Sequence, residues 1–409
     1  MDTLSKKLGI LLKFYLSLVL VILFSFGCST RPPALPAEHA QKLPWGAIDL
    51  DVKSTHEYNI VNSLGTSLLQ KIDQVKFTDN NSTISYNILA LSGGGSRGSY
   101  GIGLIVGWEK KGDMPKFDVV TGISTGAVMA PFVFVGGEEV EKAKYFYTET
   151  KTESVFIDSI LSFFSGYIMN PKPLQKLFRQ NFDKAFLDKV AAEHAKGRRL
   201  YIGTTNIDTG QLIVWDMGAI ASSDREDKYK RFSDIIYAST ALPVYLPPQY
   251  IEVDIEGEKY YQMHVDGGIY SHVFMIGLLV DWEKVLNLKK DVSERFDTTM
   301  YVIANRKYRQ RDIYTPVKQD SFDIIEAYVL IEMDLLFDKN VYRMYKSAAE
   351  KGINFKISSI PDKMENIIIT PTKFKPSEMK KLFQVGYMQG LNGIQWKERV
   401  SIDEYDNNK

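Results

Sequence analysis

Residues 87–126 read NILALSGGGSRGSYGIGLIVGWEKKGDMPKFDVVTGISTG, and this stretch decides the fold class. It holds two short apolar runs, at 87–91 and 117–121, and each is followed by a glycine-containing turn and a segment with helical periodicity. Two consecutive strand, turn and helix units predict an α/β fold in which helices cover a parallel sheet. In such a sheet, the loops at the carboxyl ends of the strands form the functional site.

The second turn carries the pattern G-x-S-x-G in Gly122-Ile123-Ser124-Thr125-Gly126. A serine on a tight strand-to-helix turn is lifted into the cleft, and the flanking glycines allow a close approach that side chains would block. The helix N-terminus behind the serine also favours developing negative charge. These features predict that Ser124 is a nucleophile. The alternative is a tight turn in which Ser124 only caps the following helix.

The first turn reads GGGSRG over residues 93–98 and satisfies the dinucleotide-binding pattern G-x-G-x-x-G. A dinucleotide site needs an acidic residue roughly 20 positions on, at the end of the next strand. Asp118 has that spacing but precedes its strand, which disfavours this interpretation. Consecutive glycine N–H groups can instead hydrogen-bond an oxyanion, and Arg97 adds positive charge there. A serine one strand–helix unit later favours the oxyanion interpretation.

A serine nucleophile needs a base, and the candidate is Asp266 in the sequence Asp266-Gly267-Gly268. It follows an apolar-rich strand expected at 260–265, so its carboxylate should face the same sheet edge. The alternative is an ordinary turn of the Asp-Gly type. Of the five histidines, only His272 follows Asp266, and six residues is short for the separate histidine loop of a Ser, acid, His triad.

Together the three motifs resemble those of the patatin-like phospholipase family, which carries G-G-G-x-R-G, G-x-S-x-G and D-G-G or D-G-A in this order. The resemblance covers about residues 86–275, and all three motifs match without a substitution. It departs at residues 269–272, where many members have an Asn-Pro pair. The resemblance implies a three-layer α/β fold, with a central, mostly parallel sheet flanked by helices and with C-terminal helical additions.

The resemblance also implies a Ser124–Asp266 dyad without a catalytic histidine. Ser124 would attack an acyl ester, and Asp266 would take its proton and later activate water. This chemistry needs no metal and no cofactor. The other motif positions are the flanking glycines Gly122 and Gly126, the DGG glycines Gly267 and Gly268, and the oxyanion-hole candidates Gly93, Gly94, Gly95, Arg97, Gly98 and Thr125.

Residues 1–27 are expected to be a lipoprotein signal peptide. Three lysines precede the uncharged apolar run 14–26, which is short for a transmembrane helix. Cys28, the only cysteine, follows in a lipobox-like Ser-Phe-Gly-Cys sequence and would carry the lipid. The alternative is an uncleaved anchor helix with an incidental cysteine. Residues 28–55 are proline-rich and predict a tether.

This N-terminus predicts a bacterial membrane-attached lipoprotein that faces the periplasm or the cell surface. Ser29 stands where an inner-membrane lipoprotein would carry aspartate, which favours the outer membrane. The rest of the chain divides into an N-terminal helix and connection (56–85), a catalytic region (86–275) and a C-terminal strand and helical extension (276–409). Within the catalytic region, the apolar segment 159–169 is either core or a lipid-contacting flap.

The chain has 409 residues, of which 44% are hydrophobic, and its 50 Lys and Arg balance its 50 Asp and Glu. That composition excludes wholesale disorder and disfavours a nucleic-acid binder. We therefore expect an acyl hydrolase for which membrane lipids are both substrate and anchor. The alternatives are a catalytically silent lipid-binding lipoprotein and a dinucleotide-binding oxidoreductase.

Overall fold

The computed structural model describes residues 15, 17, 31–51, 53–54, 59–74, 83–155, 157–158, 169–275, 296–308, 316–361 and 372–400. A nine-stranded sheet runs through these residues in the order β1-β7-β6-β3-β2-β10-β11, with β9 joined to β6 and β8 to β9. The sheet strands are β1 (Ala47–Ile48), β2 (Ile84–Leu91), β3 (Val119–Gly122), β6 (Arg199–Asn206), β7 (Gln211–Asp216), β8 (Gln249–Ile255), β9 (Glu258–Asp266), β10 (Phe296–Ala304) and β11 (Asn354–Ser359).

The middle of the sheet is parallel. Strands β6, β3, β2, β10 and β11 all pair in parallel, whereas β1, β7, β8 and β9 pair antiparallel. The two predicted strand–turn–helix units are confirmed as β2 with α3 (Gly98–Lys111) and β3 with α4 (Thr125–Val135). The sequence also predicts two hairpins, with turns at Asp208-Thr209-Gly210 and Glu256-Gly257-Glu258. Both are present, as β6 with β7 and β8 with β9.

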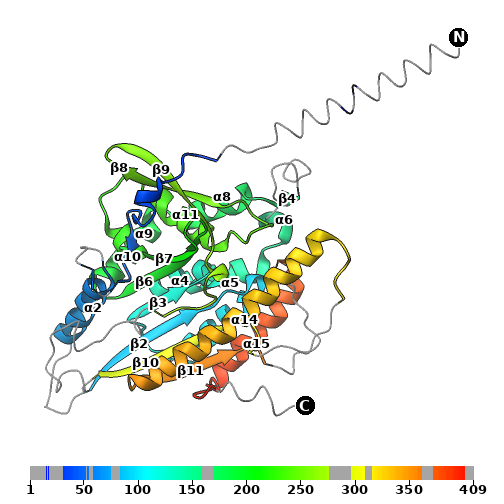
Figure 1. Cartoon of the computed structure of the whole chain (residues 1–409). Coiled ribbons are helices and arrows are strands. Elements are labelled where there is room, and N and C mark those ends of the chain that lie inside the picture. Colours follow the sequence, from blue (N-terminus) through cyan, green and yellow to red (C-terminus); the bar gives the residue numbers. More distant parts are fainter. Residues whose placement is uncertain are drawn as a thin grey trace, which may run out of the picture.

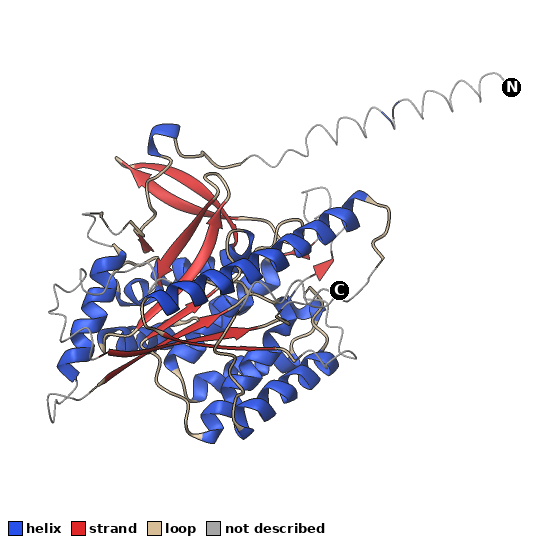
Figure 2. Cartoon of the chain, turned by 60° about the horizontal axis from the view of Figure 1, so that its bottom comes forward, coloured by secondary structure: helices blue, strands red, loops and turns tan. Residues whose placement is uncertain are grey.

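Helices cover both faces of the sheet (Figures 1 and 2). Leu89 and Leu91 of β2 join the core on the face covered by α3 and α4, while Ile88 and Ala90 join the core on the opposite face. This alternation follows from the two-residue period of a strand, and burial of both faces explains why residues 88–91 of β2 are all apolar. The remaining helices are α2 (Ile60–Gln74), α5 (Glu138–Glu149), α6 (Thr152–Val155), α8 (Lys172–Asn181), α9 (Lys184–Ala195), α10 (Met217–Ser222), α11 (Lys228–Thr240), α14 (Ser321–Glu350) and α15 (Pro376–Asn392), with short 3-10 turns η1 (Ala37–His39), η2 (Gly95–Arg97) and η3 (Gly267–Ile269).

The C-terminal part of the chain completes the sheet. β10 lies between β2 and β11 and pairs with β2 over residues 296–303. The long helix α14 crosses the same face of the sheet as α2, and α15 packs against α3 on the other face (Figure 1). The sequence predicted β10 and both helices but not β11, a six-residue edge strand with alternating burial.

The contact between α3 and α15 is made through glycines. A Cβ added at Gly103 or Gly107 of α3 would overlap backbone carbonyls of α15, and one added at Gly386 or Gly390 would overlap backbone carbonyls of α3. Glycine in a helix interior costs about 1 kcal/mol relative to alanine. Here its small size lets the two backbones touch.

Several sequence-based expectations fall outside the described residues. These are the signal peptide, Cys28, and residues 159–168 of the apolar segment. Helical spacing of apolar residues predicts the N-terminal helix over about 56–72, and the structure describes it as α2 from Ile60 to Gln74. Among the residues that the structure describes, no helix has both the length and the apolar character needed to cross a membrane.

Candidate active site

Ser124 occupies the sharp turn between β3 and α4. Its φ is 55° and its ψ is −121°, a strained conformation for a residue with a side chain. A Cβ added at Gly122 would overlap the carbonyl oxygen of Gly126, and one added at Gly126 would overlap that of Leu91. Both positions flanking the serine therefore require glycine for steric reasons.

Two neighbouring hydroxyl groups hold the turn in place. The backbone N–H of Ser124 donates to Ser239 Oγ at 3.0 Å, and that hydroxyl donates to the carbonyl of Gly203 at 2.7 Å. Tyr147 donates its phenolic proton to the carbonyl of Thr125 at 2.7 Å. Such surrounding bonds are what a strained turn needs in order to persist. Nothing in the local sequence around Ser239 or Tyr147 identified them as partners of the turn.

Asp266 lies at the end of β9, and its carboxylate reaches Ser124. Ser124 Oγ donates to Asp266 Oδ2 at 2.7 Å, while Asp266 Oδ1 accepts from the backbone N–H of Gly268 at 2.7 Å. Both side chains are buried. Burial raises the pKa of Asp266 to about 7, although the bonds from Gly268 and Ser124 act in the opposite direction. A carboxylate that titrates near neutral pH can act as a general base there.

The glycine-rich turn lies beside Ser124 and has backbone N–H groups that are available as hydrogen-bond donors. Among the described residues, the N–H groups of Gly94, Gly95 and Thr125 have no hydrogen-bond acceptor. Gly94, Gly95 and Thr125 also line the pocket that contains Ser124. This arrangement is suited to hold an oxyanion that forms next to Ser124.

Three of the expected oxyanion-hole positions need correction. The N–H of Gly93 donates to the carbonyl of His272 at 3.0 Å, so it is not available to a substrate. The N–H groups of Arg97 and Gly98 donate to carbonyls within the turn itself, because the chain enters the 3-10 turn η2 there. The Arg97 side chain still lines the pocket.

Asn305, directly after β10, holds the glycine-rich turn in position. Its amide group donates to the carbonyl of Ser92 at 2.8 Å and accepts from the N–H of Gly101 at 3.2 Å. A Cβ added at Gly94 would overlap the Asn305 carbonyl. No sequence motif contains Asn305, although its place directly after an expected strand was a usable signal.

Comparison with known proteins shows which family the region around Ser124 and Asp266 resembles. Residues 89–278 match the family model described as patatin-like phospholipase. This region of the chain is therefore similar to patatin-like phospholipases. Two curated relatives from Solanum tuberosum are similar to it: Patatin-13, 25% identical over 163 residues, and Patatin-05, 26% identical over 160 residues. Each match covers 37% of this chain and 39% of the relative, so the chain spans well under half the length of these relatives.

Among solved structures, the chain is similar to VipD from Legionella pneumophila. The sequence identity is 12% and the TM-score is 0.33, with 75% of this chain and 66% of that chain covered. The family match begins and ends within three residues of the 86–275 range that the motifs indicated. Residues 279–409 lie beyond the patatin-like match.

The pocket in front of Ser124 is mainly apolar and holds a cavity of about 120 Å³. Leu330 and Met333 of α14 and Phe374 close it from beyond the patatin-like match. An apolar pocket that ends at a nucleophile can hold the chain of a lipid ester. The other apolar residues that line it are Val128, Phe146, Val155, Met169, Leu174, Phe178, Leu242, Tyr245 and Leu246.

No described histidine contacts Ser124 or Asp266 through a hydrogen bond. His264 is buried and bonds to Thr204, and burial lowers its pKa to about 3. His272 lines the pocket, but neither of its ring nitrogens has a hydrogen-bond partner. Within the described part of the chain, no three His, Cys, Asp or Glu side chains are grouped to hold a metal ion.

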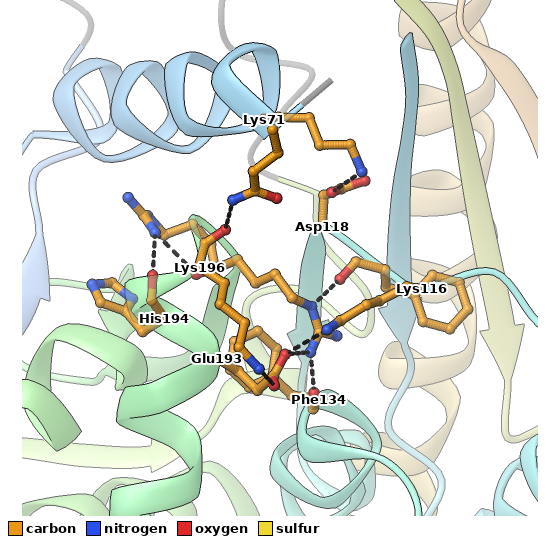
Figure 3. A network of polar contacts seen from close by, with 11 residues as sticks. Lys71, Lys116, Asp118, Phe134, Glu193, His194 and Lys196 are labelled. Atoms are coloured by element: carbon orange, nitrogen blue, oxygen red, sulfur yellow. Dashed lines mark hydrogen bonds and ion pairs between the residues drawn. The ribbon is translucent and has the colours of Figure 1, made fainter. Parts of the chain in front are cut away.

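Asp118 is the acidic residue that the dinucleotide alternative required. It directly precedes β3, whereas Ser124 follows the other end of that strand. Asp118 accepts from Lys71 Nζ at 2.8 Å (Figure 3). It also accepts from the backbone N–H of Asn87 at 2.8 Å. Both carboxylate oxygens of Asp118 thus accept structural hydrogen bonds, which argues against a ribose-binding role.

Nearby, burial opposes ionisation of Glu193, but hydrogen bonds from Lys196, Lys116 and Arg198 lower its pKa to about 2.

Proposed function

We propose that this protein is a serine acyl hydrolase that cleaves acyl esters of phospholipids or related lipids. The observation that carries the proposal is the 2.7 Å hydrogen bond from Ser124 Oγ to Asp266 Oδ2 at the end of an apolar pocket. The patatin-like match supports the lipid acyl hydrolase class. The dyad and the phospholipid substrate are the parts that we propose.

In the proposed acylation step, Asp266 takes the proton from Ser124 while Oγ attacks the ester carbonyl carbon. The carbonyl oxygen becomes an oxyanion and accepts hydrogen bonds from the N–H groups of Gly94, Gly95 and Thr125. When the tetrahedral intermediate collapses, the alcohol leaves with the proton from Asp266. The acyl group then remains bonded to Ser124 Oγ.

Deacylation repeats these roles with water. Asp266 takes a proton from a water molecule, the hydroxide attacks the acyl carbon, and the second tetrahedral intermediate releases a carboxylic acid as Ser124 regains its proton. Because Asp266 is buried, little bulk water stabilises its charged form, and this makes it a stronger base than an exposed aspartate.

Labelling with an alkyl fluorophosphonate tests the nucleophile directly. The probe bonds to an activated serine Oγ and expels fluoride, so the full-length protein in detergent should gain one adduct, which peptide mass spectrometry places on Ser124. The labelled protein should lose hydrolysis of a chromogenic fatty-acid ester. Ser67→Ala, a change at a buried serine of α2, should still be labelled. An unlabelled, folded wild type that hydrolyses no ester would support a catalytically silent lipid-binding protein instead.

A further inference from the structure

Two cationic side chains and one imidazole line the pocket next to Ser124. Arg97 comes from η2, His272 follows η3, and Arg306 follows β10. His272 and Arg306 are only 4% and 5% exposed. Asp334 of α14, half exposed, is the carboxylate paired with Arg306. The pocket therefore places two guanidinium groups and a neutral imidazole beside the nucleophile.

The His272 imidazole is unpartnered although it is buried. Neither ring nitrogen has a hydrogen bond, whereas its backbone N–H donates to Asn340 at 3.0 Å. A Cβ added at Gly93 would lie 3.0 Å from His272 Nδ1 and 3.3 Å from Ser124 Cβ, so the ring lies next to the nucleophile. A buried donor without an acceptor costs about 1–3 kcal/mol. A bound acceptor would recover that cost.

The Arg306 guanidinium has hydrogen-bonding capacity left. It pairs with Asp334 and donates to the carbonyl of Met333 at 3.3 Å, but its buried Nε has no partner. The group lies 4.9 Å from the ring centre of Phe337, which fixes its plane. Burial, followed by repulsion from Arg97, lowers the pKa of Arg306 to about 9, although the charge of Asp338 acts in the opposite direction.

We propose that Arg306 and His272 form a subsite for a phosphate group beside the Ser124 nucleophile. A guanidinium binds phosphate through paired N–H bonds, and a neutral imidazole supplies one further donor. In a glycerophospholipid, the phosphate is joined to the same glycerol unit as the ester, so it must lie a few bonds from Ser124 Oγ. The subsite rests on the proposed function and narrows its substrates to esters that carry phosphate.

Asp334 gives this proposal an internal control. It is half exposed and occupies the guanidinium that the phosphate would use. Removing its charge should therefore strengthen phosphate binding, whereas removing Arg306 should weaken it. A purely structural role for the ion pair predicts a loss of binding in both variants.

The first experiment measures binding without catalysis. Full-length Ser124→Ala protein in detergent is titrated calorimetrically with sn-glycerol 3-phosphate, inorganic phosphate and glycerol. In that background, Arg306→Gln should weaken phosphate binding about tenfold or more, and Asp334→Asn should tighten it about two- to fivefold. Lys346→Gln, on an exposed turn of α14, should change nothing. Tighter binding of glycerol phosphate indicates a lipid headgroup; tighter binding of inorganic phosphate indicates a free anion.

The second experiment separates this subsite from the proposed function. The ratio of kcat/KM for a short-chain phosphatidylcholine to kcat/KM for a neutral ester of the same acyl chain should fall about tenfold in Arg306→Gln and stay constant in Lys346→Gln. A constant ratio in Arg306→Gln, or failure of both phosphate compounds to bind, overturns the subsite and leaves hydrolysis intact. A wild type that cleaves neither ester overturns the proposed function.

Discussion

Asp266 combines nearly complete burial with hydrogen bonds from Ser124 and Gly268. The two effects oppose each other, because burial penalises the charged carboxylate and the bonds stabilise it. Burial is the larger effect and raises the pKa to about 7. The pKa of Asp266 therefore determines how the hydrolysis rate should depend on pH. It also determines how the free energy of unfolding should depend on pH.

The rate should rise with pH through neutrality. Asp266 accepts a proton from Ser124 only when it is ionised, so kcat/KM for an uncharged ester should increase from pH 5 and level off above a midpoint near 7. The measurement is initial rate against pH with a soluble short-chain ester. A profile that is flat between about pH 5 and 9 would exclude Asp266 as the base.

The stability should change in the opposite direction. Between its unfolded pKa of 3.8 and its folded pKa of about 7, Asp266 binds a proton in the folded state only, so the free energy of unfolding falls as pH rises through this range. Asp266→Asn removes that ionisation and keeps an oxygen for Gly268. We expect the variant to be inactive yet more stable than wild type at pH 8, by up to a few kcal/mol, since one pKa unit is worth about 1.4 kcal/mol.

Denaturant unfolding at several pH values checks this expectation. The advantage of Asp266→Asn should shrink steadily from pH 8 towards pH 4, where wild-type Asp266 is protonated in the fold. A variant that is less stable than wild type at pH 8 would show that burial does not dominate at this carboxylate.

At the scale of elements, the carboxyl ends of β2, β3, β9 and β10 bring together site residues that lie far apart in the sequence. The motifs at 93–98, 122–126 and 266–268 were recognisable because each is a short contiguous pattern that resembles a motif of the patatin-like family. Ser239 was not recognisable as a partner of the Ser124 turn, because an isolated polar residue has no local pattern that distinguishes it. Asn305 carried only the weaker signal of lying directly after an expected strand. β11 was missed because a short edge strand needs its partner β10 for stability and carries little apolar signal of its own.

The contact between α3 and α15 gives a prediction about elements. Gly386→Ala should gain up to about 1 kcal/mol of helix propensity, but its methyl group would overlap the carbonyl of Tyr100. Because that oxygen belongs to the backbone, the helices must separate, and overpacking of this kind costs about 1–3 kcal/mol. Thermal unfolding should therefore occur at a lower temperature. Met388→Ala, on the exposed side of the same helix, is the control, and an unchanged or higher Tm for Gly386→Ala would contradict the close contact.

At the scale of the whole molecule, the patatin-like match alone is not a complete fold. Without β10, the strand β2 would lose one of its two parallel neighbours, and the glycine-rich turn would lose Asn305. A chain that ends at residue 275 should therefore be insoluble or lack a cooperative unfolding transition, measured by circular dichroism. A chain that ends at residue 400 should fold. Cooperative unfolding of the shorter chain would show that the extension is dispensable.

We also propose that the whole protein is held at a membrane by lipid on Cys28. Cys28→Ser should abolish incorporation of labelled fatty acid and leave a precursor that keeps its first 27 residues. Ser124→Ala, which changes a different nucleophile, should keep the label. Because attachment through several acyl chains gives stable anchoring, wild type should stay with the outer-membrane fraction after a salt wash. Label on the Cys28→Ser variant would refute the site, and recovery of wild type with the inner membrane would refute the outer-membrane placement.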